Sequence, residues 1–208
     1  MAEKIFKWIL VLLGIGLLIF IGYILMIVSA FGGFDKDYSV SELKENFNAN
    51  KKEIYELKRY FNKIVPKNRF VEIEFEDDNT LFRFGIDPLD STAGNPNGPM
   101  FLEWDLKINN LQMEKIIKPL GWTCETLKVL KYKLDKANCI QIESGEPTKI
   151  GFKRSGMGMY SFNVFDKPIT DKEKVKYNDS CTYIFANDRL VLEFGGGAIG
   201  SQCFHNKK

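Results

Sequence analysis

Histidine is nearly absent from this sequence, since His205 is the only one among 208 residues. A single imidazole excludes zinc sites built from two or three histidines, and it excludes the paired-histidine motif of metalloproteases. Cys203 lies two residues from His205, but such a thiolate–imidazole pair lacks the third group that normally orients it. The nucleophile motif GxSxG is also missing. The sequence therefore predicts no catalytic residue, no bound metal and no cofactor.

The chain also lacks a strong excess of charge of either sign, with a net charge of +2. Domains that bind nucleic acid usually show a basic stripe or a large basic excess, so no nucleic-acid partner is expected. Charge is nevertheless unevenly placed: residues 67–105 hold three Lys/Arg and nine Asp/Glu, whereas residues 107–154 hold ten and five. We interpret these segments as two solvated faces that attract each other, rather than as a charged binding surface.

One cationic stretch is a candidate site for anion binding. Lys153 and Arg154 stand beside Gly156 and Gly158. Glycines allow successive backbone N–H groups to form a nest, and the two cations would favour an anion there. The alternative, which we favour, is a simple hairpin turn with the two neighbouring methionines filling the core.

A second polar grouping surrounds a loop rich in proline and glycine. Its members are Asp87, Asp90, Glu103 and Asp105. Paired carboxylates act as general acid and base in hydrolases, and clustered carboxylates bind calcium. Their spacing fits no known calcium-loop pattern. A membrane-tethered hydrolase that uses acidic residues of the 87–105 region is kept as an alternative function.

The most informative feature that is present is an uncharged run over residues 8–34. Crossing the hydrocarbon core of a bilayer takes ~20 apolar residues, and a helix satisfies its own backbone groups there within one segment. We predict a transmembrane anchor over residues 8–30, after a cytoplasmic N-terminus (1–7) and before a linker (31–38). A cleaved signal peptide is the alternative, but its apolar part is only roughly 7–15 residues long.

The orientation of this anchor is not decided by lysines, because two precede the run and two follow it within about 15 residues. Cysteine usage favours one orientation. The chain contains Cys124, Cys139, Cys181 and Cys203. An even number of cysteines after an export-type segment is compatible with disulfides in an oxidising compartment. We therefore expect a single α+β domain, residues 39–208, on the outer side of a cell membrane.

Helix geometry limits how the four cysteines can pair. Cys124 begins the helical part of the segment predicted over residues 123–137 and Cys139 follows its end, so the two lie about 20 Å apart at 1.5 Å per residue. A disulfide needs its α-carbons within about 7 Å, which excludes that pair. What remains is Cys124 with Cys181 or Cys203, or a single Cys181–Cys203 bond with the other two free.

Ser39 and Glu42 form a capping box that opens a long amphipathic helix. Apolar residues recur at a/d heptad spacing over residues 40–64, and the helix is expected to end before Pro66. Asn50 occupies the one empty position of the seam. The stripe predicts packing on the domain's own sheet, which we favour, or a coiled-coil assembly. The oligomeric state stays open.

Residues 71–76 and 81–86 alternate apolar and polar side chains around a turn, which predicts a β-hairpin. The residues expected on the buried face of the second strand and of the strand that follows are Phe82, Phe84, Ile86, Leu102, Trp104, Leu106 and Ile108. Two helices, 111–118 and 123–137, come next, and short strands complete the chain. Strand runs with two inserted helices indicate an α+β fold with a largely antiparallel sheet.

A hydrophobic N-terminal helix, an amphipathic helix and an antiparallel sheet with late cysteines resemble the layout of type IV pilin-like subunits. The resemblance covers the layout only. Pilins carry a processing site before the hydrophobic stretch and a glutamate near its start, whereas Lys7, Trp8 and Ile9 lead into the stretch here. Gly32 and Gly33 also predict a bend where a pilin helix continues. A pilin-like assembly subunit is a further alternative.

The anchor, the amphipathic helix and the missing catalytic motifs together predict a function. We expect a single-pass membrane protein whose outer domain binds a protein partner and performs no catalysis.

Overall fold

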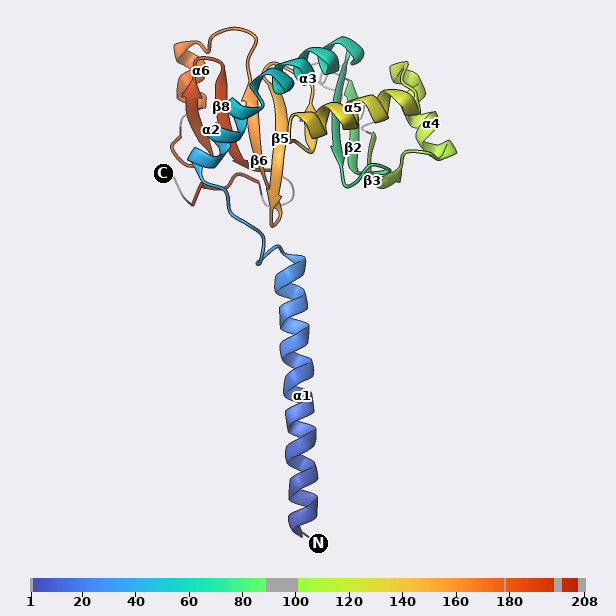
Figure 1. Ribbon diagram of the computed structural model, residues 1–208, viewed down its shortest axis with the longest axis vertical. Helices are drawn as coiled ribbons and strands as arrows, with labels where there is room; N and C mark the ends of the chain where they lie inside the picture. The colour runs from blue at the N-terminus through green and yellow to red at the C-terminus, as the bar shows by residue number, and fades with distance from the viewer. Residues whose placement is uncertain (1, 89–100, 178, 197–199, 206–208) are drawn as a thin grey trace.

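The computed structural model describes residues 2–88, 101–177, 179–196 and 200–205, and shows a long helix leading into a mixed domain (Figure 1). The helices are α1 (Ala2–Ala30), α2 (Val40–Ala49), α3 (Lys51–Ile64), α4 (Leu111–Ile117), the short 3-10 helix η2 (Lys118–Leu120), α5 (Cys124–Lys136) and α6 (Asp171–Lys176). The strands are β1 (Arg69–Phe75), β2 (Thr80–Pro88), β3 (Phe101–Lys107), β4 (Gln141–Glu143), β5 (Thr148–Ser155), β6 (Gly158–Val164), β7 (Tyr183–Asn187) and β8 (Leu190–Gly195). The α+β class predicted from the sequence is confirmed.

Helix α1 stands apart from the domain (Figure 1). Its segment Phe6–Ser29 has 24 residues, is long and apolar enough to cross a membrane, and buries none of its most apolar stretch. At about 1.5 Å per residue it spans roughly 36 Å, compared with ~30 Å of bilayer hydrocarbon. The helix ends at Ala30, and Gly32 turns the chain with a φ of 72°.

The eight strands form one sheet in the order β3-β2-β1-β4-β5-β6-β8-β7. Every neighbouring pair in it is antiparallel. Strand β4 lies between β1 and β5, and the chain reaches it only after β3 and the helices α4 and α5. The two halves of the sheet are therefore joined by a strand of three residues.

The capping box at Ser39 is present, but the amphipathic helix is split in two, contrary to the single helix predicted from the sequence. The break falls at Asn50, whose backbone adopts φ −112° and ψ 20°. Its side-chain amide donates to the Asn46 carbonyl and to the Asn46 Oδ1, at 3.0 and 3.1 Å. Asparagine competes for backbone hydrogen bonds in this way, which explains why the empty seam position became a helix end.

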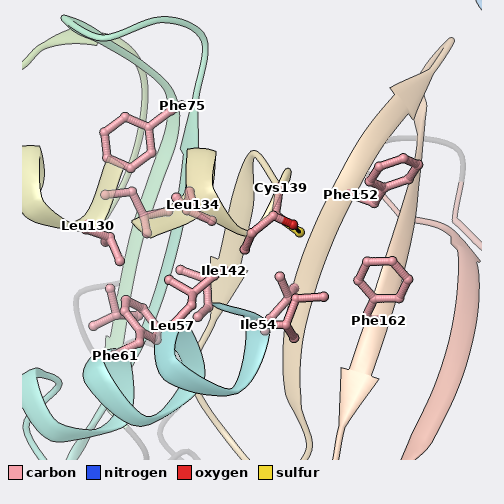
Figure 2. Close-up of a cluster of buried hydrophobic side chains, with 14 of the residues drawn as sticks. Ile54, Leu57, Phe61, Phe75, Leu130, Leu134, Cys139, Ile142, Phe152 and Phe162 are labelled. Atoms are coloured by element: carbon pink, nitrogen blue, oxygen red, sulfur yellow. Dashed lines mark hydrogen bonds between the residues drawn. The ribbon is translucent and has the colours of Figure 1, made fainter. Parts of the chain in front are cut away.

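The apolar stripe of α2 and α3 is buried inside the domain. Val40, Leu43, Phe47, Ile54, Leu57 and Phe61 are all at most 5% exposed and belong to one core cluster. Side chains of α3 and α5 meet those of β1, β4, β5 and β6 there (Figure 2). This is packing on the domain's own sheet, the outcome that the sequence favoured over a coiled coil.

The predicted alternation of β2 is wrong at one position. The β1–β2 ladder shifts register between Glu74 and Phe75, and Phe82 falls at this bulge. Leu81 takes the core position instead and is fully buried. The ring of Phe82 lies 4.5 Å from the guanidinium carbon of Arg154, on the opposite face. A β-bulge inserts one extra residue into a strand, so the inward and outward positions change places from one side of the bulge to the other. Alternation read from the sequence of one strand does not reveal this change.

The alternation predicted for the next strand is also wrong. Trp104 pairs with Arg83, so it faces away from the core together with Leu102, and it is 51% exposed. The pattern changes at Asp105, whose φ is 55°. Leu106, after this irregularity, is buried as expected.

Helix α6 was not predicted from the sequence. It has six residues and follows Thr170, which forms a capping box with Glu173. The Thr-x-x-Glu signal was present but was followed by no apolar stripe, and none of the helix's residues is buried. The segment around α6 covers a small cluster of Phe165, Ile169 and Val191 at the β7–β8 end of the sheet.

Candidate functional site

The cationic stretch considered as a candidate anion site forms the β5–β6 hairpin, and the chain's own carboxylates occupy the partners it offers. Arg154 donates from Nε to Glu74 Oε1 at 2.5 Å and from a terminal nitrogen to Glu74 Oε2 at 2.6 Å. The Gly156 backbone N–H donates to Asp35 Oδ2 at 2.9 Å. Lys153 Nζ lies over the ring of its neighbour Phe152, 5.9 Å from the ring centroid. These predicted residues therefore have separate partners and do not converge on one site.

Gly158, the fourth predicted residue, has a packing role. A Cβ at this position would lie 2.8 Å from the Phe194 ring and 3.0 Å from Gln202 Oε1. The glycine thus allows the tip of the β5–β6 hairpin to approach the end of β8 closely.

The same hairpin tip holds the segment that leaves the membrane-type helix. Besides the Gly156–Asp35 bond, Ser155 Oγ donates to Asp37 Oδ1 at 2.8 Å, and the Tyr160 hydroxyl lies 3.4 Å from the same oxygen. Burial raises the pKa of Tyr160 to about 12, so this hydroxyl stays protonated as a donor. The predicted linker is therefore attached to the domain at two carboxylates. A shallow pocket of ≈ 300 Å³ opens at this junction and includes His205.

The acidic residues considered for a hydrolase do not form a cluster in the described chain. Asp87 is in β2, opposite Phe70 of β1, while Glu103 and Asp105 are exposed on β3. Asp90 lies outside the described residues. Within the described ranges, no group of three or more His, Cys, Asp and Glu side chains is arranged to hold a metal ion.

The cysteines adopt one of the arrangements that the sequence left open. Cys181 and Cys203 form a disulfide that closes a 22-residue separation and ties the segment after β8 to the start of β7. Cys124 and Cys139 are free. Cys139 is buried, and burial raises the pKa of its thiol to about 12. This thiol is therefore an inert part of the core.

The site that the sequence did not predict is the second face of the sheet. Helices α2, α3 and α5 all pack on the first face, and α6 reaches only the β7–β8 end of the second. Ladder pairs place a continuous polar row across all eight strands of the second face. From β3 to β7 the row contains Trp104, Arg83, Glu74, Gln141, Gly151, Ser161, Glu193 and Tyr183. We call this row and its paired neighbours the polar face.

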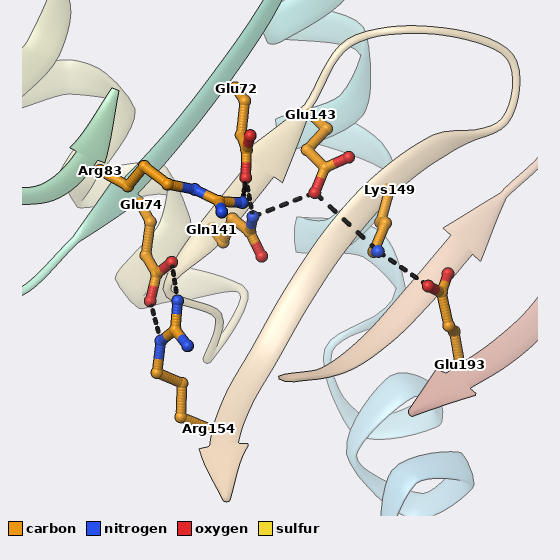
Figure 3. A network of polar contacts seen from close by, with 8 residues as sticks. All are labelled: Glu72, Glu74, Arg83, Gln141, Glu143, Lys149, Arg154 and Glu193. Carbon is orange, nitrogen blue, oxygen red and sulfur yellow. Dashed lines mark hydrogen bonds and ion pairs between the residues drawn. The ribbon is translucent and has the colours of Figure 1, made fainter. Parts of the chain in front are cut away.

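A parallel row on the same face adds partners for these charges. It contains Leu102, Gly85, Glu72, Glu143, Lys149, Asn163, Val191 and Phe185. Figure 3 shows the Glu74–Arg154 pair beside a chain of polar contacts that runs from Arg83 and Glu72 through Gln141, Glu143 and Lys149 to Glu193. Four carboxylates face three cations in this network, so it is close to neutral as a whole.

The ion pairs of the polar face join strands that are distant in sequence. Arg83 pairs with Glu72, whose carboxylate also accepts from Gln141 Nε2 at 2.7 Å. Lys149 Nζ donates to Glu193 at 2.8 Å and lies 4.0 Å from Glu143. The charged side chains of these pairs are at most a fifth exposed, and Gln141 is buried. Charges with so little contact with water require such pairing.

Burial sets the protonation behaviour of this face. It raises the pKa of Glu143, and the repulsion of Glu193 adds to the effect despite the nearby Lys149. Burial alone would lower the pKa of Lys149, but the attraction of Glu143 and Glu193 outweighs it and the net shift is upward. The lysine is therefore held charged while Glu143 is easier to protonate than an ordinary glutamate.

Two buried polar atoms on this face have no hydrogen-bond partner among the described residues: Ser161 Oγ and Arg83 Nε. Ser161 is fully buried in the middle of the long row. Buried polar atoms are normally paired, and each unpaired one costs about 1–3 kcal/mol. The polar face thus combines a fixed, nearly neutral ion network with unused donors and an exposed tryptophan at its edge.

No family model, no curated protein and no solved structure matches this chain.

Proposed function

We propose that this is a single-pass membrane protein with a partner-binding domain outside the cytoplasm. In this proposal residues 1–7 are cytoplasmic and residues 8–30 span the membrane. Residues 31–38 form a linker, and residues 39–208 form one outer domain. The observation that carries it is the combination of an exposed, membrane-length apolar helix with a disulfide in the domain that follows. Disulfides persist in oxidising compartments and are rare in the cytosol.

The attachment of the linker supports a role in presenting the domain at the membrane. Asp35 and Asp37 lie within eight residues of the end of α1, and both accept hydrogen bonds from the β5–β6 hairpin. The domain is thereby held close to the end of the membrane-type helix instead of hanging on a free tether.

The polar face is the surface we propose for the partner. Its charges are already paired within the sheet, so a partner does not have to supply a counter-charge. Trp104 provides an exposed aromatic anchor at the edge of this face, and tryptophan is the residue type most enriched at binding hot spots, together with Tyr and Arg. We propose a polar protein surface as the occupant and binding, without turnover, as the activity.

Site-specific crosslinking in the membrane tests this proposal. A photo-crosslinking amino acid is placed at Trp104 on the polar face or at Tyr132 on α5, which is similarly exposed at 61% but lies on the helical layer. We expect a discrete crosslinked protein partner from position 104 and none from position 132. Crosslinks from position 132 alone would contradict the proposed binding face.

A further inference from the structure

A second concave site lies away from the polar face, under helix α4. This pocket has a volume of ≈ 490 Å³, within the ~300–1,000 Å³ typical of small-molecule sites. It is lined by Arg69, Ile86, Phe101, Gln112, Lys115, Ile116, Pro119 and Leu120. These residues come from the start of β1, the end of β2, the start of β3 and the α4–η2 segment. Figure 1 shows α4 at the β3 end of the sheet, remote from α1.

The walls of the pocket are apolar over most of their area. Ile86 and Phe101 face each other as a ladder pair on the core side of the sheet, and both pack against the main core cluster. Ile116 and Leu120 close the opposite wall. Water in such a space makes few hydrogen bonds, so an apolar ligand gains by displacing it.

Two cations stand among these apolar residues without a counter-charge. Arg69 and Lys115 both line the pocket, and neither forms an ion pair with any residue in the described parts of the chain. Gln112 is the remaining polar lining residue and adds an amide group. The pocket therefore presents one anion-attracting region and one extended apolar region.

We propose that this pocket binds a single-chain anionic amphiphile such as a long-chain fatty acid. Its carboxylate would lie between Arg69 and Lys115, and its chain would lie along Ile86, Phe101 and Ile116. The charge complementarity of the two unpaired cations selects an acidic head, and the apolar walls select a tail without hydrogen-bonding groups.

The same walls disfavour a peptide as the occupant. Each peptide unit carries a donor and an acceptor, and burying an amide without partners costs about 1–3 kcal/mol by mutational data. The aliphatic and aromatic walls provide no such partners. This site is independent of the proposed partner-binding face and of the side of the membrane on which the domain lies.

Photolabelling of the full-length protein in lipid nanodiscs tests the proposal. The probe is a diazirine-bearing palmitic acid, and the matched probe is the corresponding diazirine-bearing alcohol. Labelled positions are read by mass spectrometry of peptides, which separates pocket labelling from labelling of the membrane-type helix. We expect the acid to label peptides containing Phe101 or residues 116–120, with displacement by unlabelled palmitate and much weaker labelling by the alcohol.

Three variants sharpen the test. Ile116→Trp fills the pocket and should abolish labelling there, whereas Leu111→Trp, an exposed position on the same helix outside the lining, should leave it unchanged. Combined Arg69→Gln and Lys115→Gln should weaken binding of the acid about tenfold or more while the apolar walls remain. Thermal melting of each variant verifies folding.

Labelling confined to α1, equal labelling by acid and alcohol, or unchanged labelling in a folded Ile116→Trp variant would each overturn the proposal. The charge variants keep it testable even if Ile116→Trp fails to fold, because they leave the core untouched.

Discussion

Gly151 shows how closely single residues of the polar face are fitted together. A Cβ at this position would lie 2.6 Å from Gln141 Oε1, 2.7 Å from Gln141 Cβ and 3.1 Å from Met159 Sδ. A contact below 3 Å with a Cβ atom of a neighbouring strand cannot be relieved by rotating a flexible chain end. The absence of a side chain at Gly151 is therefore a packing requirement of the network.

We predict that Gly151→Ala destabilises the domain by about 1–3 kcal/mol, the usual cost of overpacking. The matched control is Gly85→Ala on the same face, where the nearest contact would be an ordinary 3.4 Å to Leu102. Removing a glycine from a strand without strain stabilises by about 0.4–1 kcal/mol through the unfolded chain. Denaturant unfolding of both variants measures the difference, and equal stabilities would contradict the packing seen at Gly151.

Glu143 provides the residue-scale prediction for pH. Burial raises its pKa above the ordinary 4.5, and the attraction of Lys149 does not cancel this shift. The fold therefore favours its protonated form. Its contribution to stability is fully present below about pH 4.5 and is lost as the pH rises through the folded-state pKa. Glu143→Gln keeps a neutral acceptor for Gln141, whose Nε2 donates to Glu143 at 3.0 Å.

We therefore expect Glu143→Gln to melt at a higher temperature than the unmodified protein at pH 8, with the difference shrinking towards zero near pH 4. Melting curves across this range provide the measurement. A variant that is less stable at pH 8 would mean that the attraction of Lys149 outweighs the burial of the carboxylate.

Among the elements, the sequence predicted those whose signals are local. Ser39 opens α2 with its capping box, and the helix expected over residues 123–137 is present as α5. The misassigned positions, Phe82, Leu102 and Trp104, depend on a bulge and on a backbone irregularity that arise from pairing with a neighbouring strand. Tertiary pairing decides such positions, and periodicity within one strand contains no information about them.

The polar face could not be predicted for the same reason. The Arg154–Glu74 pair joins residues 80 apart, and Lys149–Glu193 joins residues 44 apart. Alternation marked Glu72 and Glu74 as a solvated side of a strand, which left open whether a neighbour would pair with them. Only the strand order places the charges of β1, β4, β5 and β8 in one plane.

The disulfide gives a prediction at the scale of elements, because it connects the start of β7 to the segment after β8. Cross-linking a loop of about this length contributes about 3 kcal/mol in the chain-entropy description. We expect combined Cys181→Ser and Cys203→Ser to lose about that much stability in denaturant unfolding.

Cys124→Ser is the control for this loss, since Cys124 is free and its thiol donates only to the Ile108 carbonyl at 3.3 Å, a bond that a hydroxyl retains. An unchanged midpoint for the double variant, or an equal loss for the control, would argue against a stabilising bridge.

For the whole molecule, the decisive relation is between the N-terminal helix and the domain. The most apolar stretch of α1 is not buried, yet the chain that follows the helix is held by Asp35 and Asp37 at the β5–β6 hairpin. If α1 were a signal sequence and were cleaved, the mature chain would begin at these contacts. A retained anchor makes them the hinge through which the membrane sets the position of the polar face.

The most direct test is thiol counting on the full-length protein: cells are lysed directly into denaturant without reductant, free thiols are alkylated there with a maleimide of high mass, and the products are resolved by gel mobility. The account predicts that the denatured, unreduced protein adds two maleimides, at Cys124 and Cys139, that reduction exposes two more, and that residues 1–30 remain in the mature chain. Four free thiols without reductant, or a mature chain that lacks α1, would contradict the proposed anchored and oxidised domain.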